Sequence, residues 1–203
     1  LDWMDVFKEK LNEKDYSVIG LSNLFIIDFP YFSEIAKFLR EKNNSIIIAG
    51  GQNATYNSER LLKEGLCNFV LQRESENKIN FLFDNLYDDK RTMPTPGILF
   101  EHDGKIEETS GEKDIVQLTG NLIESHKRIN IEDYCKVGSL SPYSRMAGKD
   151  IPFAGILLNR GCRGNCEFCD VRDYTGKDNR SRETKDFLDE IEYLNKKRGI
   201  GFF

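Results

Sequence analysis

Three of the five cysteines in this sequence are gathered at Cys162, Cys166 and Cys169, with the spacing C-x3-C-x2-C. Thiolates are soft donors that select zinc or iron-sulfur clusters, so a loop carrying three of them can surround one inorganic centre. A closed structural zinc site needs four ligands, commonly two C-x2-C pairs, and no Cys or His follows Cys169. The nearest other donors, His126 and Cys135, lie upstream across a long stretch of chain. The spacing favours a 4Fe-4S cluster held by three thiolates, with one iron open to a small molecule that chelates it.

The same cysteines allow a second interpretation. A structural zinc site, or thiols without a common function, would use these residues without redox chemistry. Metal identity separates the two readings, since a zinc site is colourless and an iron-sulfur cluster is brown. Gly161 and Gly164 let the loop turn tightly in either case. Arg160 and Arg163 are either solvated or offset the negative charge of a thiolate cluster.

This cysteine loop, which follows an apolar strand-like run and has Phe168 just before its last cysteine, resembles that of the radical S-adenosylmethionine (radical SAM) enzymes. The likeness continues in the stretches 170–174, 180–182 and 189–194, which are similar to the segment after the cluster loop in members with an N-terminal cobalamin-binding domain. Upstream, residues 20–22, 50–55 and 73–76 resemble parts of that domain, the first two being strand ends that line the cobalamin tail.

The resemblance implies a division of labour between protein and cofactors. Cys162, Cys166 and Cys169 would ligate three irons, and the open iron would bind S-adenosylmethionine. One electron, delivered by a donor such as flavodoxin or ferredoxin, would then cleave this cofactor to methionine and a 5′-deoxyadenosyl radical. Phe168 would pack near the adenine, or alternatively would cap a hydrophobic core under the loop. The reaction can include cobalamin-dependent methyl transfer, and the substrate is not readable from these residues.

The resemblance also implies cobalamin-binding residues in the first half of the chain. Ser22, Gly50 and Gly51 could hydrogen-bond to the nucleotide tail of cobalamin and make room for it, because glycine permits close backbone approach at the end of a strand. The alternative is an ordinary turn between a strand and a helix. The family's Asp-x-His-x-x-Gly loop is missing, since the two histidines are His102 and His126, so a lower cobalt ligand cannot come from that motif.

The elements that must position these residues follow from hydrophobic periodicity. Short apolar runs at 16–21, 45–49 and 68–71 alternate with helical patterns at 31–42, 61–66 and 75–87, which is typical of β-α units feeding a parallel sheet. We therefore predict an α/β fold with a doubly wound, Rossmann-like (flavodoxin-like) parallel sheet. A strand at 152–158, the cysteine loop, a helix at about 184–197 ending at Gly199 and a strand beginning at 200 would form the first β-α unit of a partial TIM barrel.

Three regions are expected. Residues 1–90 form the cobalamin-binding-like domain, without its first strand. Residues 91–150 form a connector rich in Pro and Gly, with a small hairpin over 97–108 that turns at Asp103 and Gly104. Residues 151–203 form the beginning of the radical SAM barrel. Because the sequence begins at Leu1 and the later barrel strands are missing, we expect a fragment that assembles a cluster but does not turn over, or one subunit of a split enzyme.

Composition limits the partners. The 29 basic and 34 acidic residues give a net charge of −5, which makes nucleic acid an improbable partner. No apolar run approaches the roughly 20 residues that a bilayer requires, so no membrane association is expected. Clustered thiols in odd number are not a secreted disulfide framework, and we expect a cytoplasmic protein.

Overall fold

The structure is a computed structural model that describes residues 2–12, 14–42, 44–86, 96–110, 116–137 and 152–203. The chain divides into two compact units, Leu1–Val116 and Gln117–Phe203. Each unit has its own core and is described here by itself.

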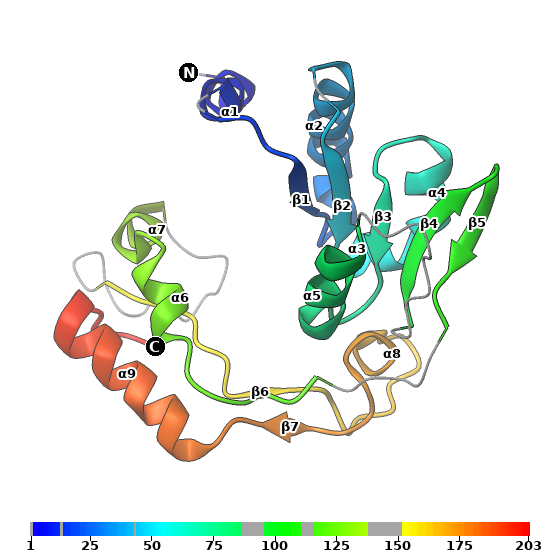
Figure 1. The fold of residues 1–203 in the computed structure, drawn as a ribbon. Coiled ribbons are helices and arrows are strands. Elements are labelled where there is room, and N and C mark those ends of the chain that lie inside the picture. Colours follow the sequence, from blue (N-terminus) through cyan, green and yellow to red (C-terminus); the bar gives the residue numbers. More distant parts are fainter. Residues whose placement is uncertain (1, 13, 43, 87–95, 111–115, 138–151) are drawn as a thin grey trace. The chain divides into compact units, whose positions relative to one another are not determined.

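The first unit is built on a mixed sheet whose strands follow one another in chain order (Figure 1). The strands β1 (Val18–Ser22), β2 (Ile46–Gly50) and β3 (Phe69–Leu71) run parallel. Their register places Ser22 opposite Gly50, and Gly50 opposite Leu71. The carboxyl ends of the three parallel strands therefore meet at one edge of the sheet, where α/β folds bind ligands.

The predicted hairpin forms, and it extends this sheet. The strands β4 (Ile98–His102) and β5 (Lys105–Glu108) pair antiparallel, and both turn residues, Asp103 and Gly104, have positive φ. β4 also pairs antiparallel with β3. Burial explains why the hairpin joins the sheet. The first three residues of β4 are apolar and buried, and an isolated hairpin in a connector could not bury them. The parallel arrangement thus holds for β1 to β3, while the whole sheet is mixed.

Helices cover both faces of the sheet. In β2, Ile47 and Ala49 join one core with residues of α2 (Phe29–Lys42) and α4 (Ser58–Lys63), while Ile48 joins a second core with Leu82 of α5 (Glu76–Asn85). The prediction that residues 45–49 form a strand buried on both faces is confirmed. The helices of this unit are α1 (Trp3–Asn12), η1 (Ile26–Asp28), α2 (Phe29–Lys42), α3 (Gln52–Tyr56), α4 (Ser58–Lys63) and α5 (Glu76–Asn85).

The second unit contains α6 (Ile123–Lys127), α7 (Ile131–Val137), β6 (Asn159–Arg160), α8 (Val171–Thr175), β7 (Arg180–Ser181) and α9 (Thr184–Arg198). The helix predicted at about 184–197 is confirmed as α9. It ends at Gly199, whose φ of 67° and N–H bond to the Asn195 carbonyl are those of a left-handed C-cap.

The strand predicted at 152–158 is reduced to a single bridge. Phe153 pairs parallel with Phe202, and the Ala154 N–H donates to the Phe202 carbonyl at 3.0 Å. The segment at Phe153, before the cysteine loop, and the segment at Phe202, after α9, therefore run parallel, as in a β-α-β unit. Neither is a regular strand. Two short parallel segments satisfy too few backbone groups to form a stable ladder by themselves.

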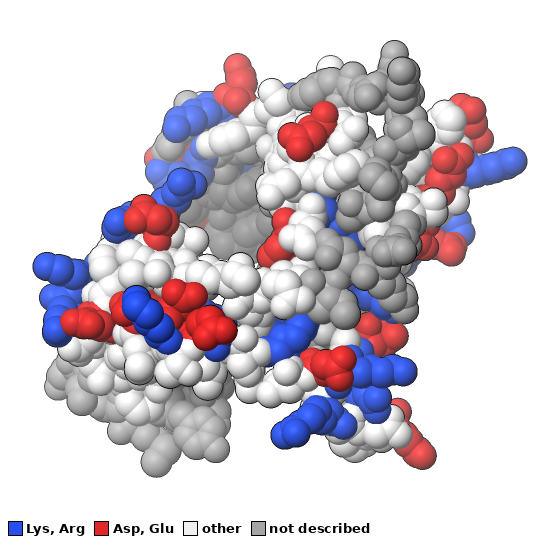
Figure 2. Space-filling model, turned by 60° about the horizontal axis from the view of Figure 1, so that its bottom comes forward, with Lys and Arg blue, Asp and Glu red and all other residues white. Residues whose placement is uncertain are grey.

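Two surface properties are plain in the structure. Among the described residues, no helix combines the length and the apolar character needed to cross a bilayer. On the face drawn in Figure 2, basic and acidic side chains are interspersed rather than separated into fields of one sign.

Candidate functional site

The cysteine loop is closed at its neck by backbone pairing. β6 and β7 flank the loop and pair antiparallel, with Asn159 opposite Ser181 and Arg160 opposite Arg180. Gly161 follows immediately with a φ of +100°, and a Cβ at this position would lie 2.0 Å from the Asp178 carbonyl oxygen. Only glycine fits this crossing, so Gly161 serves the tight turn that its sequence position predicted.

The three thiols lie on this one loop, and all are free and exposed. The Gly164 N–H donates to Cys162 Sγ at 3.3 Å. A Cβ at Gly164 would lie 3.3 Å from Cys162 Sγ and 3.8 Å from Cys166 Sγ, so these two sulfurs flank the same glycine. The Cys169 N–H donates to the Cys166 carbonyl at 3.1 Å, which places Cys169 one turn further along.

The thiols share a loop, yet they are not gathered in a coordination arrangement. Across the described part of the chain, no three His, Cys, Asp or Glu side chains are grouped so that they could hold a metal ion. The donor set nevertheless fits an iron-sulfur centre in its chemistry, because three accessible sulfurs in one short loop are the ligands that such clusters use.

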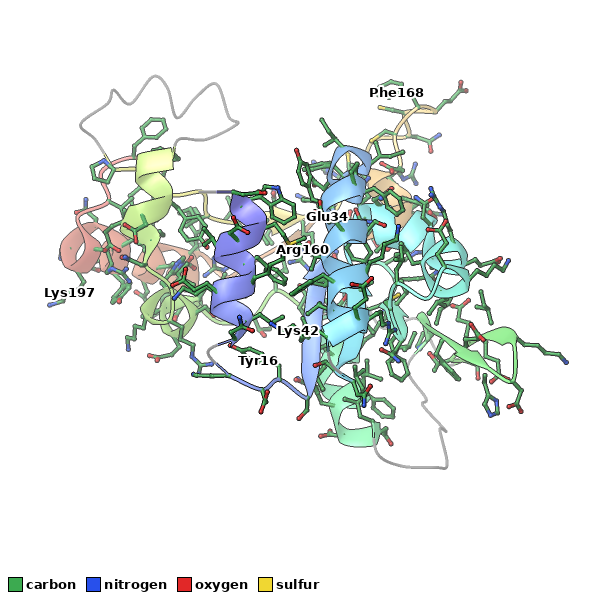
Figure 3. The ribbon with its side chains drawn as sticks, turned by 90° about the horizontal axis from the view of Figure 1, so that it is seen from above. Tyr16, Glu34, Lys42, Arg160, Phe168 and Lys197 are labelled. Carbon is green, nitrogen blue, oxygen red and sulfur yellow. The ribbon has the colours of Figure 1, made fainter. Side chains whose placement is uncertain are left out.

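Phe168 stands beside these thiols with 93% of its surface exposed. Figure 3 shows its ring at the outer end of the loop. The alternative interpretation, in which Phe168 caps a core under the loop, is therefore wrong. An exposed aromatic ring next to the cysteines is available to cover a bound molecule, and its contact with adenine stays a prediction.

The two remaining cysteines and the buried histidine are engaged elsewhere or have side chains outside the described residues. Cys67 is buried in the first core, and burial raises the pKa of its thiol to about 12. His126 is buried, and its Nε2 lies 2.8 Å from Glu190 Oε1. The side chain of Cys135 lies outside the described residues.

A second candidate site lies in the first unit, at the carboxyl edge of the parallel strands. Ser22 is exposed there, and nothing lies within 4 Å of a Cβ placed on Gly50, so both residues adjoin open space. Gly51 is different, because its φ is +108° and a Cβ would lie 2.7 Å from the Asn23 carbonyl oxygen. The close approach at Gly51 is thus made by the chain itself rather than by space left for a ligand.

Asn23, at the same edge, was not found by sequence reasoning. It is fully buried directly after Ser22, and its backbone N–H donates to the Gly50 carbonyl at 2.8 Å. Its Oδ1 accepts from Asn53 Nδ2 at 3.0 Å, while its own Nδ2 has no hydrogen-bond partner among the described residues. An asparagine after a strand is an ordinary turn residue, so its type and position gave no signal.

The sequence is similar to those of several known methyltransferases. No protein-family model matches the sequence. An uncharacterized methyltransferase of Pyrococcus horikoshii is 25% identical over 92% of this chain and 38% of its own length. A bacteriochlorophyllide d C-8(2)-methyltransferase of Chlorobaculum tepidum is 26% identical over 94% of the chain and 36% of its own. A hopanoid C-3 methylase of Methylococcus capsulatus is 25% identical over 96% and 35%.

Two solved structures of TsrM from Kitasatospora setae, a radical SAM methyltransferase, have a fold similar to this chain. Each match covers 98% of this chain and 38% of the TsrM chain. The structure with cobalamin and a [4Fe-4S] cluster has a TM-score of 0.68 at 15% identity. The structure with tryptophan and a SAM analogue has a TM-score of 0.67 at 17% identity. The chain has the fold of part of a radical SAM methyltransferase.

This likeness confirms the resemblance to radical SAM enzymes and the α/β fold class. The chain spans little more than a third of the length of these radical SAM methyltransferases and of the curated relatives. Within the part that it spans, it carries both features of interest, the cysteine loop and the carboxyl edge of a parallel sheet.

An exposed apolar segment follows the carboxyl edge of β1, and its exposure was not predicted from the sequence. Residues 24–27 directly follow Asn23, and Ile26 and Ile27 are 78% and 75% exposed. This segment continues the edge formed by Ser22 and Gly50.

Proposed function

We propose that this chain carries the cluster-binding and cobalamin-binding parts of a radical SAM methyltransferase. The observation that supports this most directly is the loop of three exposed thiols, closed at its neck by β6 and β7 in a fold shared with TsrM. Methyl transfer itself is the activity of longer proteins that this chain resembles. For this chain it is part of the proposal, which names no substrate.

In this proposal Cys162, Cys166 and Cys169 hold three irons of a 4Fe-4S cluster, and S-adenosylmethionine binds the fourth. The bound pair supplies one-electron cleavage of the sulfonium, and a reduced flavodoxin or ferredoxin is the expected electron donor. The chain itself keeps the thiols accessible on one loop, and Gly164 leaves room for two of the sulfurs. In the same proposal the exposed ring of Phe168 would shield the adenine of S-adenosylmethionine from water.

The carboxyl edge of the first unit is the proposed cobalamin site. Ser22 and Gly50 border open space there, and the side-chain amide nitrogen of the neighbouring buried Asn23 has no hydrogen-bond partner among the described residues. Gly51 stays part of the site through its backbone alone. TsrM contains cobalamin in its solved structure, and the likeness of fold supports the proposal that this chain binds cobalamin as well.

Anaerobic reconstitution with iron and sulfide tests the cluster. We expect close to four irons per chain, brown colour and an EPR signal after reduction that changes when S-adenosylmethionine is added. Replacement of Cys162, Cys166 or Cys169 by Ala should abolish the cluster. Cys67→Ala is the matched control, since this buried thiol lies in the core of the other unit.

Two results would contradict the proposal. Stoichiometric zinc that resists replacement by iron would identify a structural metal module. Retention of the full iron content in the Cys162→Ala chain would show that the metal is bound elsewhere.

A further inference from the structure

Arg182 lies directly after β7, at the neck of the cysteine loop. Its backbone N–H donates to the Leu158 carbonyl at 2.9 Å, and its Nη1 donates to the Leu157 carbonyl at 3.0 Å. The residue that ends the loop is thus bonded twice to the segment that leads into it. The backbone bond continues the β6–β7 pairing by one step, on the side of the neck away from the cysteines, and the side-chain bond reaches one residue further.

The same guanidinium is anchored in the interior of the second unit. Its Nη2 forms an ion pair with Glu190 of α9, and the two side chains are only 3% and 1% exposed. The Glu190 carboxylate also lies 2.8 Å from His126 Nε2 and accepts from the Leu122 N–H at 3.3 Å. A buried carboxylate must be paired, so these contacts fix Glu190, and Glu190 in turn fixes Arg182.

We propose that Arg182 is a positioning residue for the cluster: held by Glu190, it locks the two ends of the cysteine loop together so that the three thiols are presented as one ligand set. This inference rests on the proposed function of the loop. Arg182 touches no thiol. It acts on the cluster through the backbone carbonyls of Leu157 and Leu158, as the outer groups of metal sites do when they hold the ligands in place.

The other end of α9 offers a matched control. Arg198 pairs with Glu132 of α7 and donates to the backbone carbonyls of His126 and Ile129. It therefore ties α9 to the same helical segment with the same chemistry, yet its partners Glu132, His126 and Ile129 all lie far along the chain from the cysteine loop. A variant of Arg198 should weaken the unit without loosening the neck.

The experiment compares three variants of the full chain with the parent. Arg182→Lys keeps a positive charge but loses the planar fork that reaches both Glu190 and Leu157. The double variant Arg182→Met with Glu190→Gln removes both charges, so that neither is left buried alone. Arg198→Gln is the control. After reconstitution, the rate at which a chelator extracts iron is measured for each chain, together with the EPR spectrum of the reduced cluster.

We expect extraction from the double variant to be about 10-fold faster than from the parent, with Arg182→Lys between them and Arg198→Gln close to the parent. In the metal-free chain, hydrogen exchange at the Arg182 amide should be faster in the double variant and unchanged in Arg198→Gln. This second measurement requires no cluster.

The outcomes separate this inference from the proposed function. A double variant that holds iron as firmly as the parent overturns the positioning role alone, and so does an equal loss of iron from the Arg198→Gln chain. A parent chain that binds no iron overturns the proposed function, while the exchange measurement still decides whether Arg182 closes the neck.

Discussion

Ser22 at the end of β1 lies opposite Gly50 at the end of β2, and the space above Gly50 is open. Gly50 can therefore be replaced without a clash, which sets it apart from its neighbour Gly51. A substitution at Gly50 therefore tests the proposed ligand site, whereas one at Gly51 tests the packing of the chain against Asn23.

Gly50→Val should abolish cobalamin binding and leave the fold intact. A β-branched side chain suits a strand, and a Cβ at Gly50 meets nothing within 4 Å, but the side chain fills the edge where the ligand is proposed to lie. Titration with hydroxocobalamin, followed by absorbance, measures binding, and circular dichroism checks the fold. A variant that binds cobalamin as the parent does would argue against this edge as the site.

Gly51→Ala should lower the free energy of unfolding by about 2 kcal/mol. The φ of +108° is strained for an L-residue, and the added Cβ would meet the Asn23 carbonyl oxygen at 2.7 Å. Urea denaturation of the parent, Gly51→Ala and Gly50→Ala measures the effect. Equal stability of the two variants would contradict the asymmetry between these adjacent glycines.

The loop cysteines should react with iodoacetamide much faster than Cys67 in the metal-free native chain. Cys162, Cys166 and Cys169 are exposed, whereas Cys67 is buried and the pKa of its thiol is raised to about 12, so almost none of it is thiolate near neutral pH. Mass spectrometry of peptides after timed labelling gives each rate separately. Comparable labelling of Cys67 under native conditions would show that the first core opens readily.

Acid should destabilise the second unit through Glu190. Burial is the largest influence and would raise the pKa of this carboxyl, but hydrogen bonds from His126, Arg182 and the Leu122 N–H together hold the pKa below its ordinary value. A carboxyl with a lowered pKa stabilises the fold fully above its ordinary value of 4.5, and this contribution is lost as the pH falls through the lower folded value.

Urea denaturation at a series of pH values between about 3 and 6 tests this expectation. The parent should lose stability as the pH falls below about 4.5, and Glu190→Gln should show a flatter dependence over the same range with lower stability at pH 6. Asp189→Asn, which changes an exposed carboxylate on the same helix, is the control. Parallel curves for the parent and Glu190→Gln would show that another group governs the acid response.

Periodicity was enough to predict the parts of the fold whose burial is decided locally. The consecutive, β-branched Ile46, Ile47 and Ile48 favoured a strand covered on both faces, and Gly199 favoured the end of a helix, and the structure has both. Periodicity could not show that β4 pairs with β3, because pairing between distant segments depends on which buried edge is left to cover. Nor did it show that the segment at 152–158 forms only one bridge.

For the candidate sites, the sequence was informative where the residue types and their spacing alone indicate a function. The spacing of Cys162, Cys166 and Cys169 is readable because few other roles use it. Asn23, Arg182 and Glu190 were not assigned roles, because each acquires its role from partners far away in the chain. The sequence did not show that the Asn23 carbonyl approaches Gly51, because a Gly-Gly pair looks the same whether a ligand or the chain's own backbone comes close to it.

The hairpin beyond β3 also determines the direction in which the sheet can grow. Antiparallel β4 occupies one side of β3, and the outer strand β5 presents mostly exposed charged side chains, which discourage further pairing. On the opposite side, in the part of the chain that the structure describes, β1 pairs only with β2 and offers the apolar, half-buried residues Val18, Ile19 and Leu21. The edge at β1 is therefore the one that favours the addition of another parallel strand, from this protein or from a second one.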